Sequence, residues 1–129
     1  MGIQFWQDSA KKIVDPKIFS VEAAKLSETL AGVRNRNKRT QIRRFYDEVL
    51  RLDQDAKRLG DDKWPDILAR LHLLIPKGAY AQGRELVSKE FVDFIRGCVQ
   101  QVQSREDLAV FANLFEAFMG FYKLDRPKD

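Results

Sequence analysis

The 129-residue sequence contains a single cysteine, Cys98, and a single histidine, His72. One cysteine excludes an internal disulfide and is typical of a protein that works in a reducing cytoplasm. One cysteine and one histidine cannot supply the four ligands of a Cys/His zinc site. These two scarcities therefore predict a cytoplasmic protein without a metal site of that kind.

Long apolar runs are missing as well. Nothing in the chain approaches the roughly 18 to 20 consecutive apolar residues of a membrane span. Residues 1–13 hold no apolar run followed by a small-residue cleavage site, so we expect no secretory signal. The length fits one domain, and 44% apolar with 33% charged residues is typical of a globular protein with no membrane partner.

What the sequence does contain is a local excess of positive charge. The net charge is only +4. Six cations and no acid nevertheless lie in the basic block of residues 34–44: Arg34, Arg36, Lys38, Arg39, Arg43 and Arg44. With those six removed from the 23 cations, 17 remain against 19 acids. Such a block is typical of a surface that binds a polyanion, although many are only solvated loops.

The hydrophobic pattern predicts an all-α fold, a compact single-domain bundle of about five helices over residues 20–129. Residues 1–19 are weakly patterned, so we expect a tail or loosely packed N-terminal arm with Phe5 and Trp6 as candidate anchors. Ser20 is a candidate N-cap of the first helix, which Gly32 would end.

The clearest predicted helix follows Thr40, a candidate N-cap. Apolar residues recur along it at gaps of three and four, as the core face of a helix requires. They are Ile42, Phe45, Val49, Leu52, Ala56 and Leu59. Gly60 would end this helix, Pro65 would begin the next one, and Pro76 would stop that one.

Two further helices are predicted in the second half of the chain. An apolar pattern over residues 86–102 predicts the first. Ser104, with Asp107 three residues later, predicts the start of the second through a variant capping box. Because 13 of the 17 residues in 108–124 are apolar, we expect this helix to be the centre of the bundle or to form a subunit contact.

No catalytic set can be assembled from the residue types present. A nucleophile needs a base within reach, and the sole histidine lies in an apolar run over residues 71–75, where we expect burial. Asp61, Asp62 and Asp66 could hold a cation, but acids gather at helix N-termini for dipole reasons alone. Because a phosphate-binding glycine loop is also absent, the sequence predicts no enzyme, no metal and no cofactor.

The basic block is unfavourable for folding where it stands. With Thr40 as the N-cap, four cations crowd the start of one helix: Lys38, Arg39, Arg43 and Arg44. Each opposes the helix dipole at a cost of about 0.3–1 kcal/mol, whereas a phosphate would bind the free N–H groups there. We therefore predict that the block binds nucleic acid. Arg51 is a weaker candidate, because acids at i,i+4 spacing flank it.

Three segments, in order, resemble a known family. Residues 37–49 carry a basic residue and Thr-Gln-Ile-Arg before an aromatic pair. Residues 74–84 carry a Pro-Lys turn followed by Ala-Tyr-Ala and Gly-Arg, and the aromatic pattern of residues 115–123 is similar too. Together they resemble the small helical subunit of the type III-A CRISPR–Cas effector (Csm) complex.

This resemblance implies a non-catalytic small subunit of an antiviral interference complex. Members stack in several copies as a filament, beside the backbone subunits that hold the guide, and contact crRNA and target RNA through the phosphate backbone. The implied partners are those RNAs, the backbone and large subunits, and further copies of the chain, with single-stranded DNA as another candidate. Lys77 and Arg84 flank the Ala-Tyr-Ala turn and so join the RNA-binding candidates, which are Arg34, Arg36, Lys38, Arg39, Arg43, Arg44, Arg51, Lys77 and Arg84.

The residues alone leave another class of function open. A helical protein-interaction adaptor or homo-oligomeric scaffold would dock through the aromatic C-terminal helix and bind no nucleic acid. A helix-turn-helix DNA regulator is less favoured, because the helix after the basic block needs one face for the core. A metal-dependent nuclease is least favoured, for want of converging acids and histidine.

Overall fold

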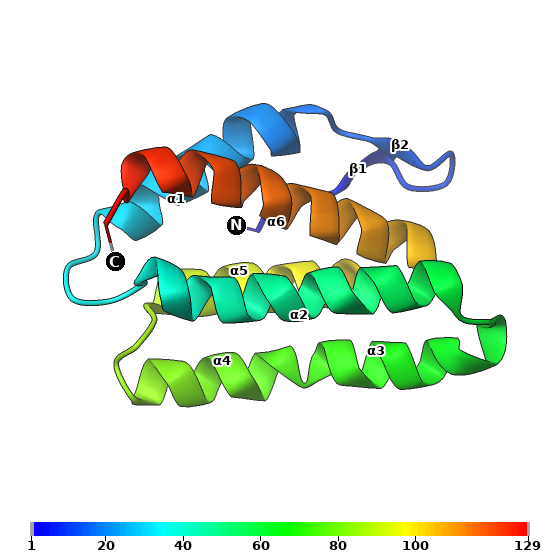
Figure 1. The fold of residues 1–129 in the computed structure, drawn as a ribbon. Coiled ribbons are helices and arrows are strands. Elements are labelled where there is room, and N and C mark those ends of the chain that lie inside the picture. The colour runs from blue at the N-terminus through cyan, green and yellow to red at the C-terminus, as the bar shows by residue number, and fades with distance from the viewer. Residues whose placement is uncertain (1, 129) are drawn as a thin grey trace.

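The structure, a computed structural model, describes residues 2–128 and consists mainly of helices (Figure 1). Along the chain the elements are β1 (Trp6–Asp8), β2 (Ile13–Val14), η1 (Ile18–Glu22), α1 (Ala23–Ala31), α2 (Arg39–Arg58), η2 (Asp61–Lys63), α3 (Trp64–His72), α4 (Leu74–Gly83), α5 (Lys89–Gln101) and α6 (Arg105–Asp125). The strands form one antiparallel hairpin. The predicted all-α bundle is confirmed.

The helices pack in layers, with α1 and α6 on one side, α2 and α5 in the middle, and α3 and α4 on the other side (Figure 1). Helix α3 and helix α4 follow one another along the same edge of the molecule, so that together they run antiparallel to α2. This return of the chain brings α4 alongside the first half of α2, which carries part of the basic block.

Helix α6 supplies half of the buried aromatic residues. Phe111, Phe115, Phe118 and Tyr122 are all fully buried, and successive rings lie in contact, with centroids 4.9 Å apart for Phe118 and Tyr122. The buried face of α2 is the predicted one: Ile42, Phe45, Val49, Leu52 and Ala56 are buried, and Leu59 is half-buried. Hydrophobic periodicity therefore identified the core face of α2, while the capping box and the high apolar content identified α6.

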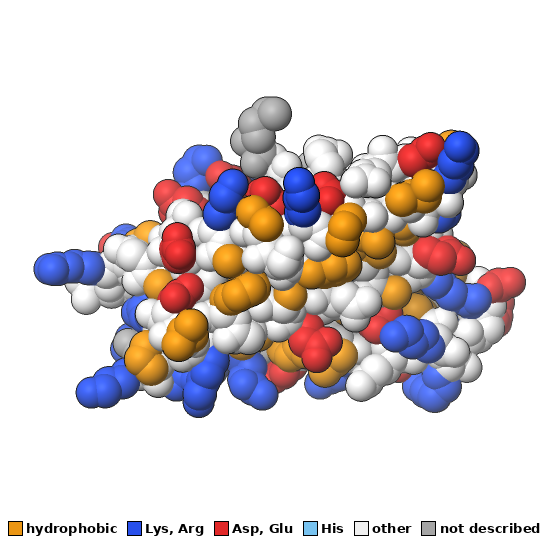
Figure 2. All heavy atoms as spheres, turned by 90° about the horizontal axis from the view of Figure 1, so that it is seen from above, with side chains coloured by type: hydrophobic (Ala, Val, Ile, Leu, Met, Phe, Trp, Pro, Cys, Tyr) orange, Lys and Arg blue, Asp and Glu red, His pale blue; other side chains and the backbone are white. Residues whose placement is uncertain are grey.

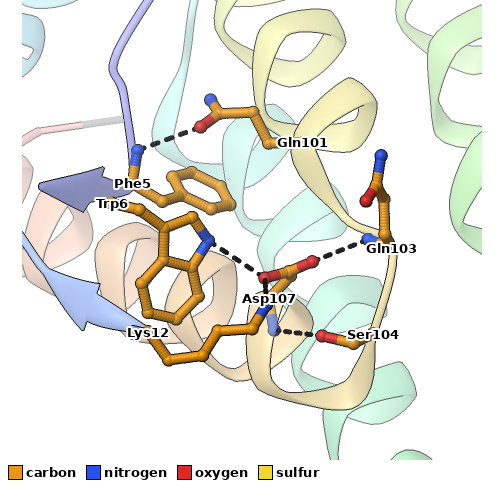
Figure 3. A network of polar contacts seen from close by, with 7 residues as sticks. All are labelled: Phe5, Trp6, Lys12, Gln101, Gln103, Ser104 and Asp107. Atoms are coloured by element: carbon orange, nitrogen blue, oxygen red, sulfur yellow. Dashed lines mark hydrogen bonds and ion pairs between the residues drawn. The ribbon is translucent and has the colours of Figure 1, made fainter. Parts of the chain in front are cut away.

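The N-terminal residues pack more tightly than the sequence indicated (Figure 3). Phe5 is fully buried, and its backbone N–H donates to Gln101 Oε1 at 2.9 Å. Trp6 Nε1 donates to the buried carboxylate of Asp107 at 3.0 Å, and Lys12 Nζ lies 3.3 Å from the same oxygen. The expectation of a tail or loosely packed arm is wrong, although both expected anchors do anchor it. The boundary between arm and bundle stays a prediction.

Three helix starts differ from the predictions. The first helical segment begins at Ile18 with Lys17 as its N-cap, so Ser20 lies inside it. Helix α2 has Lys38 as its N-cap in place of Thr40. Residues 86 and 87 precede α5, whose N-cap Ser88 accepts a hydrogen bond from a backbone N–H. The Ser104 cap of α6 is confirmed, because its side chain accepts from the backbone N–H of Asp107.

Pro76 does not end a helix. The break comes earlier, at Leu73, and Pro76 lies in the first turn of α4, where its missing N–H leaves no backbone bond unmade. The expected turn at residues 76–78 is therefore helical. His72 and Leu73 are both exposed, because the buried positions of this run are only Leu71 and Leu74. The expected burial of His72 is wrong.

Candidate nucleic-acid interface

A groove of about 300 Å³ separates α2 from α4. We call it the α2–α4 groove. Its lining residues are Gln41, Arg44, Phe45 and Glu48 from α2, and Leu74, Lys77, Tyr80, Ala81, Arg84 and Leu86 from α4 and the segment after it. The floor is apolar, since Phe45, Leu74 and Ala81 are buried. The groove thus joins residues from two of the three segments that carried the family resemblance.

The α2–α4 groove is positively charged, and its cations are free to bind an anion. Arg44, Lys77 and Arg84 are exposed, and within residues 2–128 none of them forms an ion pair. The one acid in the lining, Glu48, is already engaged, with Arg51 Nη1 at 3.5 Å and Arg70 Nη2 at 3.9 Å. A bound anion would therefore meet three uncompensated cations above an apolar floor.

Tyr80 adds an aromatic ring to the α2–α4 groove. Its exposed fraction is 68%, far above that of the ordinary core aromatics. The guanidinium carbon of Arg84 lies 5.8 Å from the ring centroid, within the range of a cation–π contact. Tyr80 belongs to the Ala-Tyr-Ala motif of the family resemblance, but the sequence did not predict it as a binding residue, because a tyrosine one turn from a basic residue is in itself a weak signal.

A second cationic surface lies on the other side of α2. A hollow of about 270 Å³ is lined by Arg39, Thr40, Arg43, Met119 and Lys123. Helix α2 begins there without a side-chain cap and without an acid in its first turn. Because Lys38 is the N-cap, Arg43 and Arg44 lie in the second turn and not, as predicted, in the first. In Figure 2 Lys and Arg side chains lie at both ends of the molecule, and one of these is the end where α2 begins.

Other predicted RNA-binding residues already have partners in the fold. Arg36 pairs with Glu85 at 2.8 Å, and Arg39 Nη2 donates to the carbonyl of Pro127 at 2.8 Å. Arg51 pairs with Glu48, three residues before it, and among the described residues it forms no ion pair with the acids at i,i+4 spacing that the sequence indicated. Arg34 and Lys38 are exposed on the connection before α2. That any of these cations binds RNA stays a prediction.

Asn37 fixes the basic block against the rest of the fold. This residue is fully buried, and its backbone N–H donates to the carbonyl of Leu86, at the rim of the α2–α4 groove, at 3.0 Å. Tyr122 Oη donates to the Asn37 carbonyl at 2.6 Å. Asn37 has φ of 61°, a left-handed conformation that asparagine tolerates better than most residues. Sequence reasoning missed this role, although an asparagine inside a cationic loop was a usable signal.

The surroundings shift the pKa of several side chains, and two of these shifts concern the core and the cationic surfaces. Burial raises the pKa of the Cys98 thiol well above its usual range, which fits the predicted core position. Burial also raises the pKa of Tyr46, and Glu116 adds to that effect while Arg43 opposes it. Tyr46 therefore lies close enough to the second cationic surface for Arg43 to influence its ionisation.

The remaining candidates form no reactive cluster in the described part of the chain. No group of three or more His, Cys, Asp and Glu residues within residues 2–128 could hold a metal ion. Asp61 instead pairs with Arg105 at 2.6 Å. None of the described helices is long and apolar enough to cross a membrane.

Comparison with known proteins gives one match. The family model described as Csm2 Type III-A matches residues 15–128. Neither the curated proteins nor the solved structures yield a significant match. The matched region includes every element that builds the α2–α4 groove, and it omits the residues of the N-terminal hairpin.

Proposed function

The chain belongs to the Csm2 type III-A family and is thus a small subunit of the type III-A CRISPR–Cas effector complex, and from this premise we propose that it binds the RNA of that complex without catalysing a reaction. In this proposal several copies stack in the cytoplasm beside the backbone subunits. Their basic surfaces contact the crRNA and target RNA.

The α2–α4 groove carries the proposal. Arg44 and the pair Lys77 and Arg84 are 33 or more positions apart in the sequence, yet the fold brings them to one hollow. None of them forms an ion pair within the described residues. Their positive charge therefore contributes little to the stability of the fold, and a neutral side chain would serve as well. Three such cations at one groove suit the phosphates of a nucleic acid.

The kind of recognition also follows from these side chains. Arginine and lysine at an exposed groove bind phosphate oxygens, and such contacts position a strand without reading its bases. RNA is commonly recognised by shape, sugar and phosphate. Choice of sequence would then be left to base pairing between guide and target.

Two features support the other parts of the proposal. His72 is exposed and forms no hydrogen bond or ion pair with a side chain among residues 2–128, and Cys98 is buried, so neither favours nucleophilic catalysis. On the face formed by α1 and α6, Figure 2 shows hydrophobic side chains among charged ones. There Phe19 of η1 lines a shallow hollow together with Asn113, Glu116 and Ala117 of α6, and this mixed apolar and polar lining suits contact with another protein surface, such as a second copy.

RNA binding by charge variants tests the proposal. We expect Arg44→Glu with Lys77→Glu to lower the affinity for a 20-nucleotide single-stranded RNA by well over tenfold in fluorescence anisotropy. The matched control is Lys25→Glu with Arg96→Glu, which changes the net charge equally at exposed positions outside the groove. If all six cations of the basic block met phosphates, the parent would show a log–log salt slope of roughly −4 on a single strand, at about 0.7 per contact.

Two results would contradict the proposal. Equal losses in the test and control variants would mean that RNA responds to net charge and not to the groove. No RNA binding by the parent, either alone or assembled with its complex, would favour the protein-interaction adaptor.

A further inference from the structure

The α2–α4 groove holds one side chain that phosphate binding does not explain. Tyr80 exposes 68% of its surface, so its ring adds little to the core, and leaving an aromatic ring in water is unfavourable. By contrast, Tyr46 packs against Phe115 with ring centroids 5.4 Å apart, and Tyr122 is fully buried. An exposed ring inside a cationic groove therefore suggests a ligand that packs against the ring.

The neighbours of Tyr80 narrow the chemistry of that ligand. Lys77, Tyr80 and Arg84 lie three and four residues apart on α4 and its C-cap, which places them on one face. Arg44 faces them from α2. The Arg84 guanidinium, 5.8 Å from the ring centroid, holds positive charge beside the ring. The groove thus presents a flat aromatic surface bordered by cations on both helices.

We propose that Tyr80 is a stacking platform for one unpaired base of bound single-stranded RNA, while Arg44 and Lys77 hold phosphates on either side of that nucleotide. Proteins that bind single strands combine a cationic groove with aromatic rings in this way, and the contact tolerates any base because every base has a flat face. This inference rests on the proposed function and adds to it a preference for unpaired over paired RNA.

The preference follows from geometry. In a duplex both faces of an internal base are already stacked, so Tyr80 has no face to bind and only the phosphate contacts remain. The basic block at residues 34–44 itself contains no aromatic residue. The fold supplies the ring from α4, a different segment.

The test compares Tyr80→Leu, which removes the flat ring, with Tyr80→Phe, which keeps it. The full-length chain is titrated with a 12-nucleotide RNA that carries 2-aminopurine at its centre, and with the matching duplex. We expect Tyr80→Leu to weaken single-strand binding about 5- to 150-fold, the equivalent of one base stacked on an aromatic ring. Tyr80→Phe should bind within about twofold of the parent, and the duplex affinity should be unchanged in both variants.

Further measurements distinguish a loss of base stacking from a loss of charge contacts and from a loss of folding stability. The fluorescence of 2-aminopurine should be quenched by the parent and by Tyr80→Phe, but not by Tyr80→Leu. The salt slope should be the same for all three proteins, because no phosphate contact is removed. Their thermal melts should coincide, because the ring is exposed.

The outcomes distinguish this inference from the proposed function. If Tyr80→Leu binds the single strand as tightly as the parent while Arg44→Glu with Lys77→Glu does not, stacking is wrong and the RNA-binding function stands. A loss of equal size for duplex and single strand would also overturn stacking. If the parent binds neither RNA, both proposals fall together.

Discussion

Asn37 and Ser88 exchange two hydrogen bonds across 51 positions of sequence. Asn37 Nδ2 donates to Ser88 Oγ at 2.9 Å, and the Ser88 backbone N–H donates to Asn37 Oδ1 at 2.8 Å. Both residues are buried, and Ser88 is also the N-cap of α5. The pair therefore joins the basic block, at Asn37, to the segment that follows the α2–α4 groove, and so fixes the start of α2 relative to that groove.

Asn37→Ala tests how much this pair contributes to folding. We expect a loss of about 2–4 kcal/mol in the free energy of unfolding, because the buried N–H of Ser88 loses its acceptor. The measurement is urea denaturation followed by circular dichroism. Asn35→Ala is the matched control, since Asn35 also has a positive φ, of 63°, but is exposed. Similar losses in both variants would show that left-handed strain, and not the hydrogen bonds, decides the cost.

Helices α2 and α6 could be predicted from sequence because burial repeats along them with the helical period. The core face of α2 from Ile42 to Ala56 is buried as expected. In the middle of α6 the exposed positions are Asn113, Glu116 and Gly120, and near its end Lys123 and Leu124 are exposed as well. A long helix with one buried face needs apolar residues at helical spacing along that face, and this pattern is visible in the sequence.

The elements that were not predicted have weaker signals in the sequence. The break at Leu73 has no glycine or proline, while Pro76, a strong breaker elsewhere, is tolerated in a first helical turn. The N-terminal hairpin has strands of only three and two residues, too short for alternation to emerge. Its turn uses a positive φ at Lys12, where a glycine would have been the usual signal.

The α2–α4 groove could not be predicted as a site from the sequence. Arg44 was named from the charge of its own segment, and Lys77 with Arg84 from a family resemblance. Their meeting depends on how α3 and α4 return along α2, which is set by packing against α5 and α2. Tyr80 becomes informative only once that geometry shows it exposed between the cations.

The N-terminal hairpin should contribute directly to stability. Phe5→Ala removes a fully buried ring that stacks on Phe111 with centroids 6.4 Å apart. We expect a loss of about 3–5 kcal/mol in the free energy of unfolding, measured by chemical denaturation. The control Gln7→Ala, at an exposed position of β1, should change it by less than about 0.5 kcal/mol. A small effect of Phe5→Ala would restore the idea of a loosely packed arm.

Cys98 should be protected from alkylation in the folded protein. Only the thiolate reacts, and burial raises the pKa of this thiol, so we expect iodoacetamide at pH 8 to modify it only when α5 opens. Denaturing urea should make modification complete, as mass spectrometry can follow. Rapid modification without urea would mean that α5 opens locally.

The same shift predicts how Cys98 affects stability at alkaline pH. The folded pKa lies above the unfolded value, so the contribution of the thiol is fully present below an unfolded pKa of about 8.5. It should decline as the pH rises further, because the unfolded chain then ionises while the folded one does not. In Cys98→Ala this part of the decline should disappear from the pH profile of the unfolding free energy. An unchanged profile would mean that the thiol contributes nothing to it.

The start of α2 should show a conflict between stability and RNA binding. Thr40 is exposed in a first turn that carries no acid, so Thr40→Glu places a negative charge at the positive end of the helix dipole. We expect the free energy of unfolding to rise by about 0.3–1 kcal/mol at low salt, and the gain to fade in 1 M NaCl. Thr29→Glu, near the C-terminal end of α1, is the matched control and should destabilise the protein slightly.

Affinity for RNA should change in the opposite direction. Thr40 lines the hollow that also holds Arg43 and Lys123, so a carboxylate there would repel a phosphate and neutralise part of the local positive charge. We expect the affinity of Thr40→Glu for single-stranded RNA to fall several-fold in anisotropy titrations at low salt. A more stable variant that binds RNA as well as the parent would exclude this end of α2 from the RNA surface. The α2–α4 groove would then be the part of the surface that still accounts for binding.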